Sequence, residues 1–527
     1  MKLKNILKMK LLPNYSTLIL FSTFYFTGII NVSAQSPTTS PLVDTSALTY
    51  QGGFIIQAHA NSVSQSNYGA GIIEYNPANH SLFLAGHLQD GAIGEFAIPA
   101  LVNSTDITLL NSTTVLHEFR EILNVTPNPQ IIDRVSGMKL YNGKLIINGV
   151  EFYDAPANNT HTTLILSDAS DITTSAIDGY YELQGAAHIA GWISDIPTEW
   201  QSLLGGNYIG GNSSKYAINS RNPMGVSAFV FNPDSLVGTP SGVIPTQTLL
   251  DFDLTNPLYK SYMPTHFNAL YNILTLTGST GTGHTWADAA ATVGTNDLWT
   301  SKSQASYGFI IPGTRTYMTI GSSGGHNSGI GYKATQNNGN VCGGPCPYDS
   351  EDYYNYYWLW NVNDLLDVKN GIQQPYNILP YDRGVFNVPF QTDVYNGGIP
   401  KHNPITGGTF DPASGLLYLS IFSGGSVTAY ARNPAIAVYK IDVTTLSITD
   451  ETFSESVSIA PNPATDIIII NIDDNILKEA IIYNNLGQIM KVETTNEISV
   501  ANLSKGIYFV KVIAQDEKVA IKKIIKQ

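Results

Sequence analysis

The sequence predicts an all-β fold, in which a β-propeller of about seven blades is followed by a small C-terminal β-sandwich. Three observations favour it. Charged residues make up 13% of the 527 residues, about half the usual quarter. Gly (46) and Tyr (30) are plentiful, and alternating apolar runs are separated by Asn-Gly and Asp-Pro turns. Coiled coils, long disordered chains and helical repeats need more charge and are excluded.

The central region is repetitive. One unit reads GIIEYNPANHSLFLAGHLQDGAIGEFAIP, and the next is GMKLYNGKLIINGVEFYDAPANNTHTTLIL, with Asn142-Gly143 as its first turn. Related units follow in FNALYNILTLTG and in GGTFDPASGLLYLSIFSGG. Units that recur about every 45 to 70 residues indicate an array whose members bury their faces against their neighbours. A propeller closes such an array of strands, whereas an open solenoid, the alternative, would need shorter repeats.

The first 34 residues predict a secretory signal peptide. Four lysines within the first ten residues precede an apolar run at 18–32, and Val32-Ser33-Ala34 forms a small-residue cleavage site. A transmembrane anchor is the alternative. The run is short and contains Ser and Thr, which disfavours a membrane span.

The C-terminal segment 454–527 differs in composition from the region before it. Lys and Glu return, Tyr becomes rarer, and short alternating strands follow the turns Pro461-Asn462-Pro463 and Asn485-Leu486-Gly487. The marks PNP, IYNNLGQ and LSKGIYFV and the basic C-terminal end resemble the C-terminal sorting domain of the type IX secretion system of Bacteroidetes. This resemblance implies that the protein leaves the cell, and that the tail is removed or used for surface attachment. A carbohydrate-binding sandwich is the alternative.

The remaining domain, residues 35–453, is acidic, with 15 Lys and Arg against 32 Asp and Glu. A nucleic-acid-binding domain would have the opposite sign. An anionic ligand therefore has to meet positive charge that is local to its site. The chain has no GxSxG elbow, Walker loop, HExxH motif or EF-hand loop.

In a propeller, functional residues are expected in the central funnel, on loops and strand ends. Polar side chains stand beside glycines or small residues at several predicted strand ends. The candidate catalytic residues are His87, Tyr153, His188, Tyr208 and Arg221. Any one of them could instead be a hydrogen-bonded side chain that lines a structural channel. A set of His, Tyr and Arg that recurs at blade ends favours a functional role.

Two cysteines lie in a Gly-rich excursion. Cys342 and Cys346 are separated by Gly-Gly-Pro, and His326 lies upstream. In a secreted protein such a pair forms a disulfide, or the two thiolates bind zinc together with His326 and a fourth ligand such as His402 or His284. Both readings are structural rather than catalytic.

The stretches EYNPANHSLFLAGHLQDGAIGEF, GAAHIAGW, NSRNPMGVSAFVF, YGFIIPGTRTYMTIGSSGGHNSGIGYK and GGTFDPASGLLYLS resemble secreted bacterial propeller proteins, among them seven-bladed ulvan lyases. The resemblance covers most of residues 48–443. It implies β-elimination of a sulfated rhamnose-uronate polysaccharide by His, Tyr and Arg residues in the central cleft. It also implies a structural zinc, which favours the interpretation that the two cysteines bind a metal ion. A further histidine is expected about twenty residues before the Gly-His motif, and here Asn67 and Tyr68 stand in its place.

The chemistry of β-elimination assigns the roles. The uronate carboxylate has to be neutralised, and Arg221 is the natural cation for it. A base takes the C5 proton and an acid protonates the departing O4 oxygen, for which His and Tyr are suited. A non-catalytic glycan-binding propeller at the cell surface is the alternative, supported by the missing histidine. A glycoside hydrolase is a further alternative, without a distinctive motif.

Overall fold

The structure is a computed structural model of the chain. It describes residues 36–154, 158–213, 223–236, 242–253, 255–258, 298–300, 302–332, 335–343, 345–391, 402–426, 428, 431–441, 453, 456–472, 476–484, 489–515 and 519–527. The predicted signal peptide lies outside these residues. The domain boundaries after residues 34 and 453 stay predictions.

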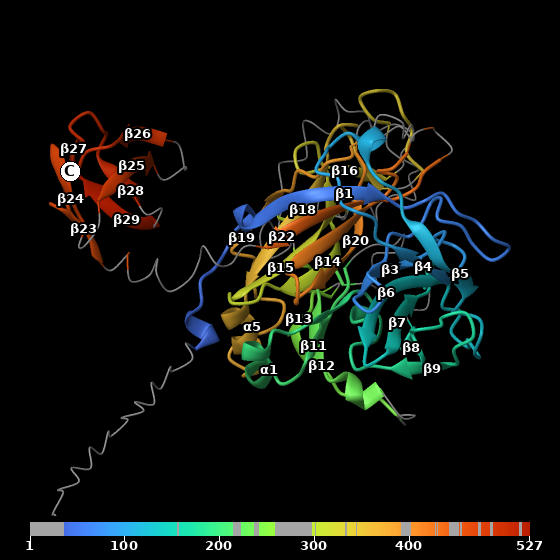
Figure 1. Cartoon of the computed structure of the whole chain (residues 1–527). Coiled ribbons are helices and arrows are strands. Elements are labelled where there is room, and N and C mark those ends of the chain that lie inside the picture. Colours follow the sequence, from blue (N-terminus) through green and yellow to red (C-terminus); the bar gives the residue numbers. More distant parts are fainter. Residues whose placement is uncertain are drawn as a thin grey trace, which may run out of the picture. The chain divides into compact units, whose positions relative to one another are not determined.

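Five four-stranded antiparallel sheets dominate the described part of residues 48–441, and Figure 1 shows their arrangement. The first sheet consists of β2 (Ile73–Asn76), β3 (Ser81–Ala85), β4 (Ala92–Ala97) and β5 (Thr114–Glu121). The second consists of β6 (Arg134–Tyr141), β7 (Lys144–Val150), β8 (His161–Leu166) and β9 (Ile177–Glu182). The third consists of β10 (Ile193–Asp195), β11 (Tyr208–Gly210), β12 (Ala228–Phe231) and β13 (Gln247–Leu250). In each, consecutive strands pair, as the short turns predict.

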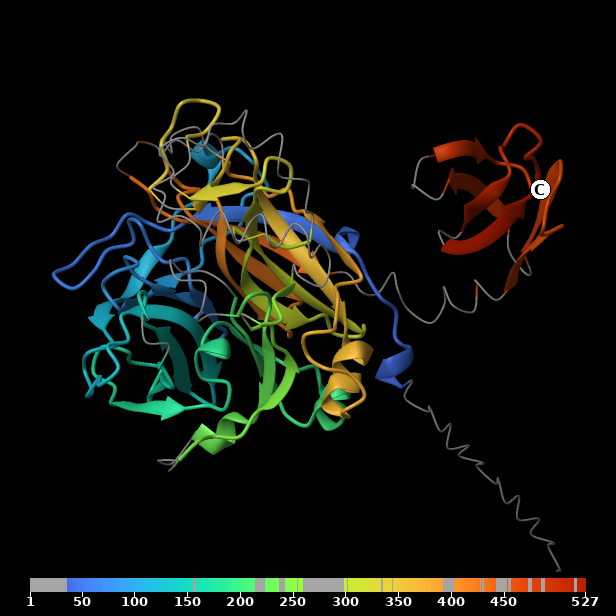
Figure 2. The same cartoon turned by 180° about the vertical axis from the view of Figure 1, so that it is seen from behind.

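The fourth sheet consists of β14 (Gln304–Ile310), β15 (Thr316–Gly324), β18 (Tyr353–Asn361) and β19 (Asp382–Val385). A small hairpin, β16 (Ile330–Tyr332) with β17 (Pro345–Pro347), is inserted before β18. The fifth consists of β20 (Ile405–Asp411), β21 (Leu416–Ile421) and β22 (Ala435–Ile441), and is completed by β1 (Leu48–Ile55). The N-terminal strand of the domain therefore pairs with its last strand. Figure 2 shows the fourth sheet in yellow beside the fifth, whose strands β20 to β22 are orange and whose strand β1 is blue.

The first strands of the five sheets are neighbours in cyclic order. They pack in the sequence β2, β6, β10, β14 and β20, and β20 packs against β2 again. Near their starts, the Ser136 hydroxyl donates to the carbonyl of Ala190 at 2.5 Å. Near their ends, Lys139 Nζ lies 2.9 Å from Asp195 Oδ2. Because starts meet starts and ends meet ends, the first strands run in the same direction.

The centre of this ring is closely packed. A Cβ at Gly137 would lie 1.9 Å from the carbonyl oxygen of Gly191, and one at Gly407 would lie 2.1 Å from that of Gly71. Only glycine allows strands to approach this closely. The central cavity, lined by residues of all five first strands, has a volume of about 10 Å³, which is the space of at most one water. The predicted central funnel is therefore filled here, and a ligand has to bind at an end of the ring.

Among the described residues, two short α-helices follow strand ends in this region, α1 (Thr198–Leu204) after β10 and α5 (Val362–Lys369) after β18. Asn361 caps α5, and its side-chain oxygen accepts the N–H of Asn363 at 3.1 Å. None of the helices in the described residues has the length and apolar character that crossing a bilayer requires.

The C-terminal segment forms two sheets of its own. One consists of β23 (Val457–Ala460), β24 (Ile467–Ile472) and β27 (Glu497–Ser499). The other consists of β25 (Leu477–Asn484), β26 (Ile489–Glu493), β28 (Gly506–Ala514) and β29 (Val519–Lys526). Both contribute to one separate hydrophobic cluster. The predicted antiparallel sandwich is present, with seven strands where about six were expected.

Candidate functional site

The predicted site residues lie at two different ends of the sheets. We call the end at which the first strands begin the upper end, and the opposite end the lower end. Second strands return to the upper end, so His87 after β3 and Tyr153 after β7 lie there. His188 also lies there, because it precedes β10. Tyr208 opens β11 opposite Asp195 and therefore lies at the lower end.

His87 is held in a tight loop at the upper end. Its backbone N–H donates to Ser64 Oγ at 3.0 Å, and its Nδ1 accepts the N–H of Gln89 at 3.3 Å. Asp90 Oδ1 is 3.7 Å from the same Nδ1. The side chain is 23% exposed, and within the described residues no hydrogen bond engages Nε2. That nitrogen is thus available to a ligand.

Tyr68 and Arg432 complete a His-Tyr-Arg cluster with His87. The rings of Tyr68 and His87 are 6.0 Å apart in an edge-to-face arrangement. The Arg432 guanidinium carbon lies 5.0 Å from the centroid of the Tyr68 ring, within cation–π distance. In an acidic domain this guanidinium supplies the local positive charge that an anionic ligand needs.

Arg432 was missed by the sequence analysis although a sequence signal exists. It stands in Arg432-Asn433-Pro434, directly before β22, and Arg221 stands in the same Arg-Asn-Pro motif before β12. Both strands are the third of their sheets. The two arginines thus precede the third strands of their sheets in the sequence, Arg432 by three residues and Arg221 by seven. Arg221 itself lies outside the described residues.

His188 and Tyr153 do not join the His87 cluster. His188 Nδ1 is 2.6 Å from Asp251 Oδ1, and the Ser227 hydroxyl donates to the His188 carbonyl at 2.5 Å. The carboxylate orients this imidazole within the third sheet. Tyr153 is 58% exposed, in the loop after β7.

Tyr208 belongs to a buried ionic network at the lower end. Lys139 Nζ lies 2.9 Å from both Glu74 Oε1 and Asp195 Oδ2 and 5.9 Å from the centroid of the Tyr208 ring. Burial lowers the pKa of Lys139, but the two carboxylates outweigh it, so the net pKa is raised. Burial raises the pKa of Tyr208. The network links first strands and does not share a site with His87.

The zinc prediction is wrong. Cys342 and Cys346 form a disulfide with an S–S distance of 2.08 Å, which matches the alternative that the sequence left open. Neither sulfur is then a thiolate that could bind metal. His326 instead stacks on Tyr356 with ring centroids 4.6 Å apart. Among the described residues, no group of three or more His, Cys, Asp or Glu side chains is placed to hold a metal ion.

Residues of the fourth and fifth sheets, and of the loops next to them, line a cavity of about 190 Å³ at the upper end. It is lined by Lys302, Gln304, Ser322, Ser323, Tyr353, His402, Pro404 and Phe422. His402 is 9% exposed. Burial, together with the charge of Lys302, lowers its pKa to about 4. Burial also lowers the pKa of Lys302. His402 was considered in the sequence only as a zinc ligand, and Lys302 was missed.

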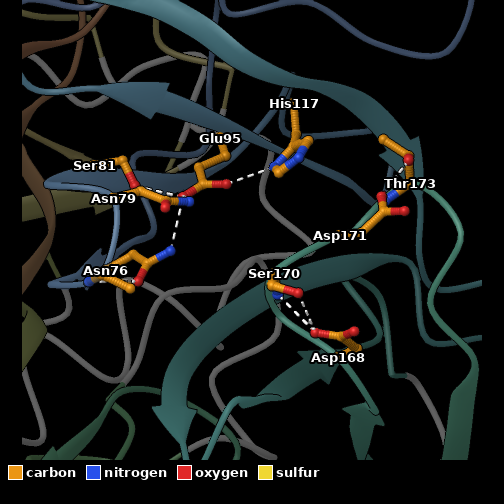
Figure 3. Close-up of polar contacts among 10 residues, drawn as sticks. Asn76, Asn79, Ser81, Glu95, His117, Asp168, Ser170, Asp171 and Thr173 are labelled. Atoms are coloured by element: carbon orange, nitrogen blue, oxygen red, sulfur yellow. Dashed lines mark hydrogen bonds and ion pairs between the residues drawn. The ribbon is translucent and has the colours of Figure 1, made fainter.

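A buried carboxylate in the first sheet is fully engaged by hydrogen bonds (Figure 3). Glu95 Oε1 accepts from Asn76 Nδ2 at 2.8 Å, from Asn79 Nδ2 at 3.1 Å and from the hydroxyl of Ser81. Its Oε2 lies 2.6 Å from His117 Nδ1. Because the side chain is fully buried and its lone pairs are used, Glu95 ties strands together rather than serving as a catalytic base.

The C-terminal segment matches a known family. Residues 458–527 match the secretion system C-terminal sorting domain, which confirms the predicted tail. The protein is therefore exported by the type IX secretion system to the extracellular space or the cell surface, and the tail interacts with that machinery.

Among curated proteins, an ulvan lyase of Nonlabens ulvanivorans is 33% identical over 92 residues. The match covers 16% of this chain and spans 17% of that protein. Among solved structures, the extracellular domain of a hybrid two-component system of B. thetaiotaomicron is 11% identical with a TM-score of 0.26, over 90% of this chain and 57% of that one. A fungal alcohol oxidase of the AA5 family is 9% identical with a TM-score of 0.25, over 91% of this chain and 100% of that one. At such TM-scores these two likenesses carry no argument.

Proposed function

We propose that residues 35–453 form a five-bladed β-propeller that cleaves a uronate-containing polysaccharide outside the cell by β-elimination. Each four-stranded sheet is then one blade, and the pairing of β1 with β22 closes the ring. The cyclic packing of the five first strands supports this reading. The sequence predicts about seven blades, and the described residues contain five sheets of this kind.

The observation that carries the activity is the cluster of Arg432, Tyr68 and His87. β-Elimination requires a cation beside the uronate carboxylate, so that the neighbouring C5–H becomes acidic. The Arg432 guanidinium, set over the Tyr68 ring, supplies this cation. It takes the role that the sequence assigned to Arg221.

His87 and Tyr68 are the proton-transfer groups. One takes the C5 proton, the C4–O4 bond breaks as the C4–C5 double bond forms, and the other protonates the departing O4 oxygen. The Tyr68 ring contacts the guanidinium and also contacts the His87 ring edge-to-face, with centroids 6.0 Å apart. Secretion brings the site to extracellular polysaccharides, and the partial similarity to an ulvan lyase supports the substrate class.

The test is the ultraviolet absorbance of the unsaturated uronate, which only elimination creates. The parent protein is assayed against ulvan and other uronate polysaccharides, beside Arg432→Ala, His87→Ala and Tyr68→Phe. Lys369→Ala, in α5 at the lower end, is the matched control. The parent and the control should generate the absorbance, and the three variants should not. If the parent protein generated no absorbance on any of the polymers, the proposal would be overturned.

A non-catalytic glycan-binding propeller is the second candidate. Asn67 stands near the place where a histidine is expected, and its Oδ1 accepts the backbone N–H of Arg432 at 2.7 Å, so it serves the loop structure. Binding of ulvan that depends on Arg432, without any unsaturated product, would establish this alternative.

A further inference from the structure

A cavity apart from the His87 cluster has the properties of an anion site. The space of about 190 Å³ between the fourth and fifth sheets is far larger than the ~10–15 Å³ that one water needs. A neighbouring cavity of about 170 Å³ shares Tyr353 and His402 with it. The lining of the larger cavity contains hydroxyl, amide and imidazole groups together with one ammonium group.

Among the described residues, the ammonium group of Lys302 has no acidic partner. In the part of the chain that the structure describes, no carboxylate lies within ion-pair distance of its Nζ. This contrasts with Lys139, which is buried between two carboxylates. Lys302 is half-buried, and a cation that is partly removed from water without compensation is costly to the fold. Burial accordingly lowers the pKa of Lys302, and a bound anion would offset that cost.

The groups around Lys302 are suited to complete the site. Gln304 and Ser322 line the same cavity and offer neutral donors. The rings of Tyr353 and His402 stack, with centroids 5.9 Å apart, and form a rigid wall. Every side chain named here either carries positive charge or can donate a hydrogen bond. No acidic side chain is among the lining residues.

We propose that this cavity binds an oxyanion, a sulfate or carboxylate group, through the ammonium of Lys302. Gln304 and Ser322 donate further hydrogen bonds to it, and Tyr353 and His402 wall the site. The anionic group comes either from free sulfate or from a sulfated or uronate sugar, since the chemistry is the same. The site does not depend on the lyase activity, because none of its residues belongs to the His87 cluster.

The experiment measures the Tm of the full chain in sodium sulfate and in sodium chloride at equal ionic strength. Glucuronate and a sulfated monosaccharide are tested in parallel to distinguish the sources. Sulfate or one of the sugars should raise the Tm of the parent protein more than chloride does. Lys302→Gln should weaken this binding by roughly 30-fold or more, the scale for losing one member of a buried charge pair.

Lys369→Gln, the lysine control at the lower end, should respond as the parent does. Ser322→Ala keeps the charge and provides a second variant if Lys302→Gln does not fold, and its binding should be weaker than that of the parent. Equal Tm shifts in sulfate, both sugars and chloride for the parent would overturn the proposal. The proposal would also be overturned if both Lys302→Gln and Ser322→Ala bound the anion as tightly as the parent does. The Tm measurement does not need lyase activity. The anion site can therefore be tested even if the protein has no such activity, and the two proposals can fail separately.

Discussion

The backbone N–H of Arg432 donates a hydrogen bond to Asn67 Oδ1 at 2.7 Å, although 365 positions separate the two residues. The Tyr68 N–H donates to the Arg432 carbonyl at 3.2 Å. These two bonds join the loop before β2 to the loop before β22. They place the guanidinium over the Tyr68 ring, so the proposed site exists only when the first and fifth sheets are adjacent.

The first prediction concerns the coupling of Arg432 and His87. Arg432→Ala should lower the rate of elimination by on the order of 10²-fold or more, since it removes one preorganised charge. His87→Ala should cost about 10²–10⁴-fold if His87 transfers a proton. Residues that act as a unit are not additive, so the double variant should lose little more than the worse single variant. Losses that multiply would show that the two residues act independently.

Much of the local structure could be predicted from the sequence because turns are encoded locally. Asn142 and Gly143 have positive φ values of 48° and 74°, and Tyr141 pairs with Lys144 across them. This is the hairpin that Asn-Gly predicts. The number of four-stranded sheets was not predictable in this way, because insertions such as the hairpin β16–β17 lengthen single units.

The candidate site could be predicted only in part. His87 was found because it ends a recognisable strand, and Arg432 could have been found from its Arg-Asn-Pro motif. That Lys302 and His402 line the same cavity could not be predicted, because this depends on which sheets are neighbours. The spacing of Cys342 and Cys346 suits either a disulfide or zinc, so only the sulfur–sulfur contact decides between them.

The second prediction concerns the lower end. Lys139→Ala leaves Glu74 buried without its cation, and breaking such a pair typically costs about 3–5 kcal/mol. Urea unfolding should show this loss in the free energy of unfolding. Lys144→Ala is the control, because its ammonium donates to a backbone carbonyl at 3.3 Å and forms no ion pair within the described residues. If both variants were equally stable, the network would not contribute to the fold.

The third prediction concerns the cysteines. The purified protein should hold no zinc on these residues, and a thiol reagent should find no free thiol in the unreduced, denatured chain. Cys342→Ser opens a loop with a sequence separation of 4, so it should cost only about 2 kcal/mol by the chain-entropy account. One equivalent of zinc together with two titratable thiols would contradict the disulfide.

The last prediction concerns the pH dependence of stability at His402. Its pKa is about 4 in the folded chain and about 6.5 when unfolded. Between these values the unfolded chain binds the proton and the folded chain does not, so stability falls as the pH is lowered. The shift corresponds to a loss of about 3 kcal/mol by pH 4. The charge of Lys302, the neighbour of His402 in the cavity, opposes the protonation of His402 and adds to the effect of burial on its pKa.

Replacing His402 with Gln separates this effect from the general acid sensitivity of the chain. The free energy of unfolding of the parent and of His402→Gln should be measured at several values between pH 7 and pH 4. The gap between the two should change in favour of the variant as the pH falls, because Gln binds no proton. His161→Gln is the matched control, since His161 is exposed, and its curve should follow the parent. Parallel curves for the parent and His402→Gln would show that His402 takes up its proton equally well in the folded and unfolded chains.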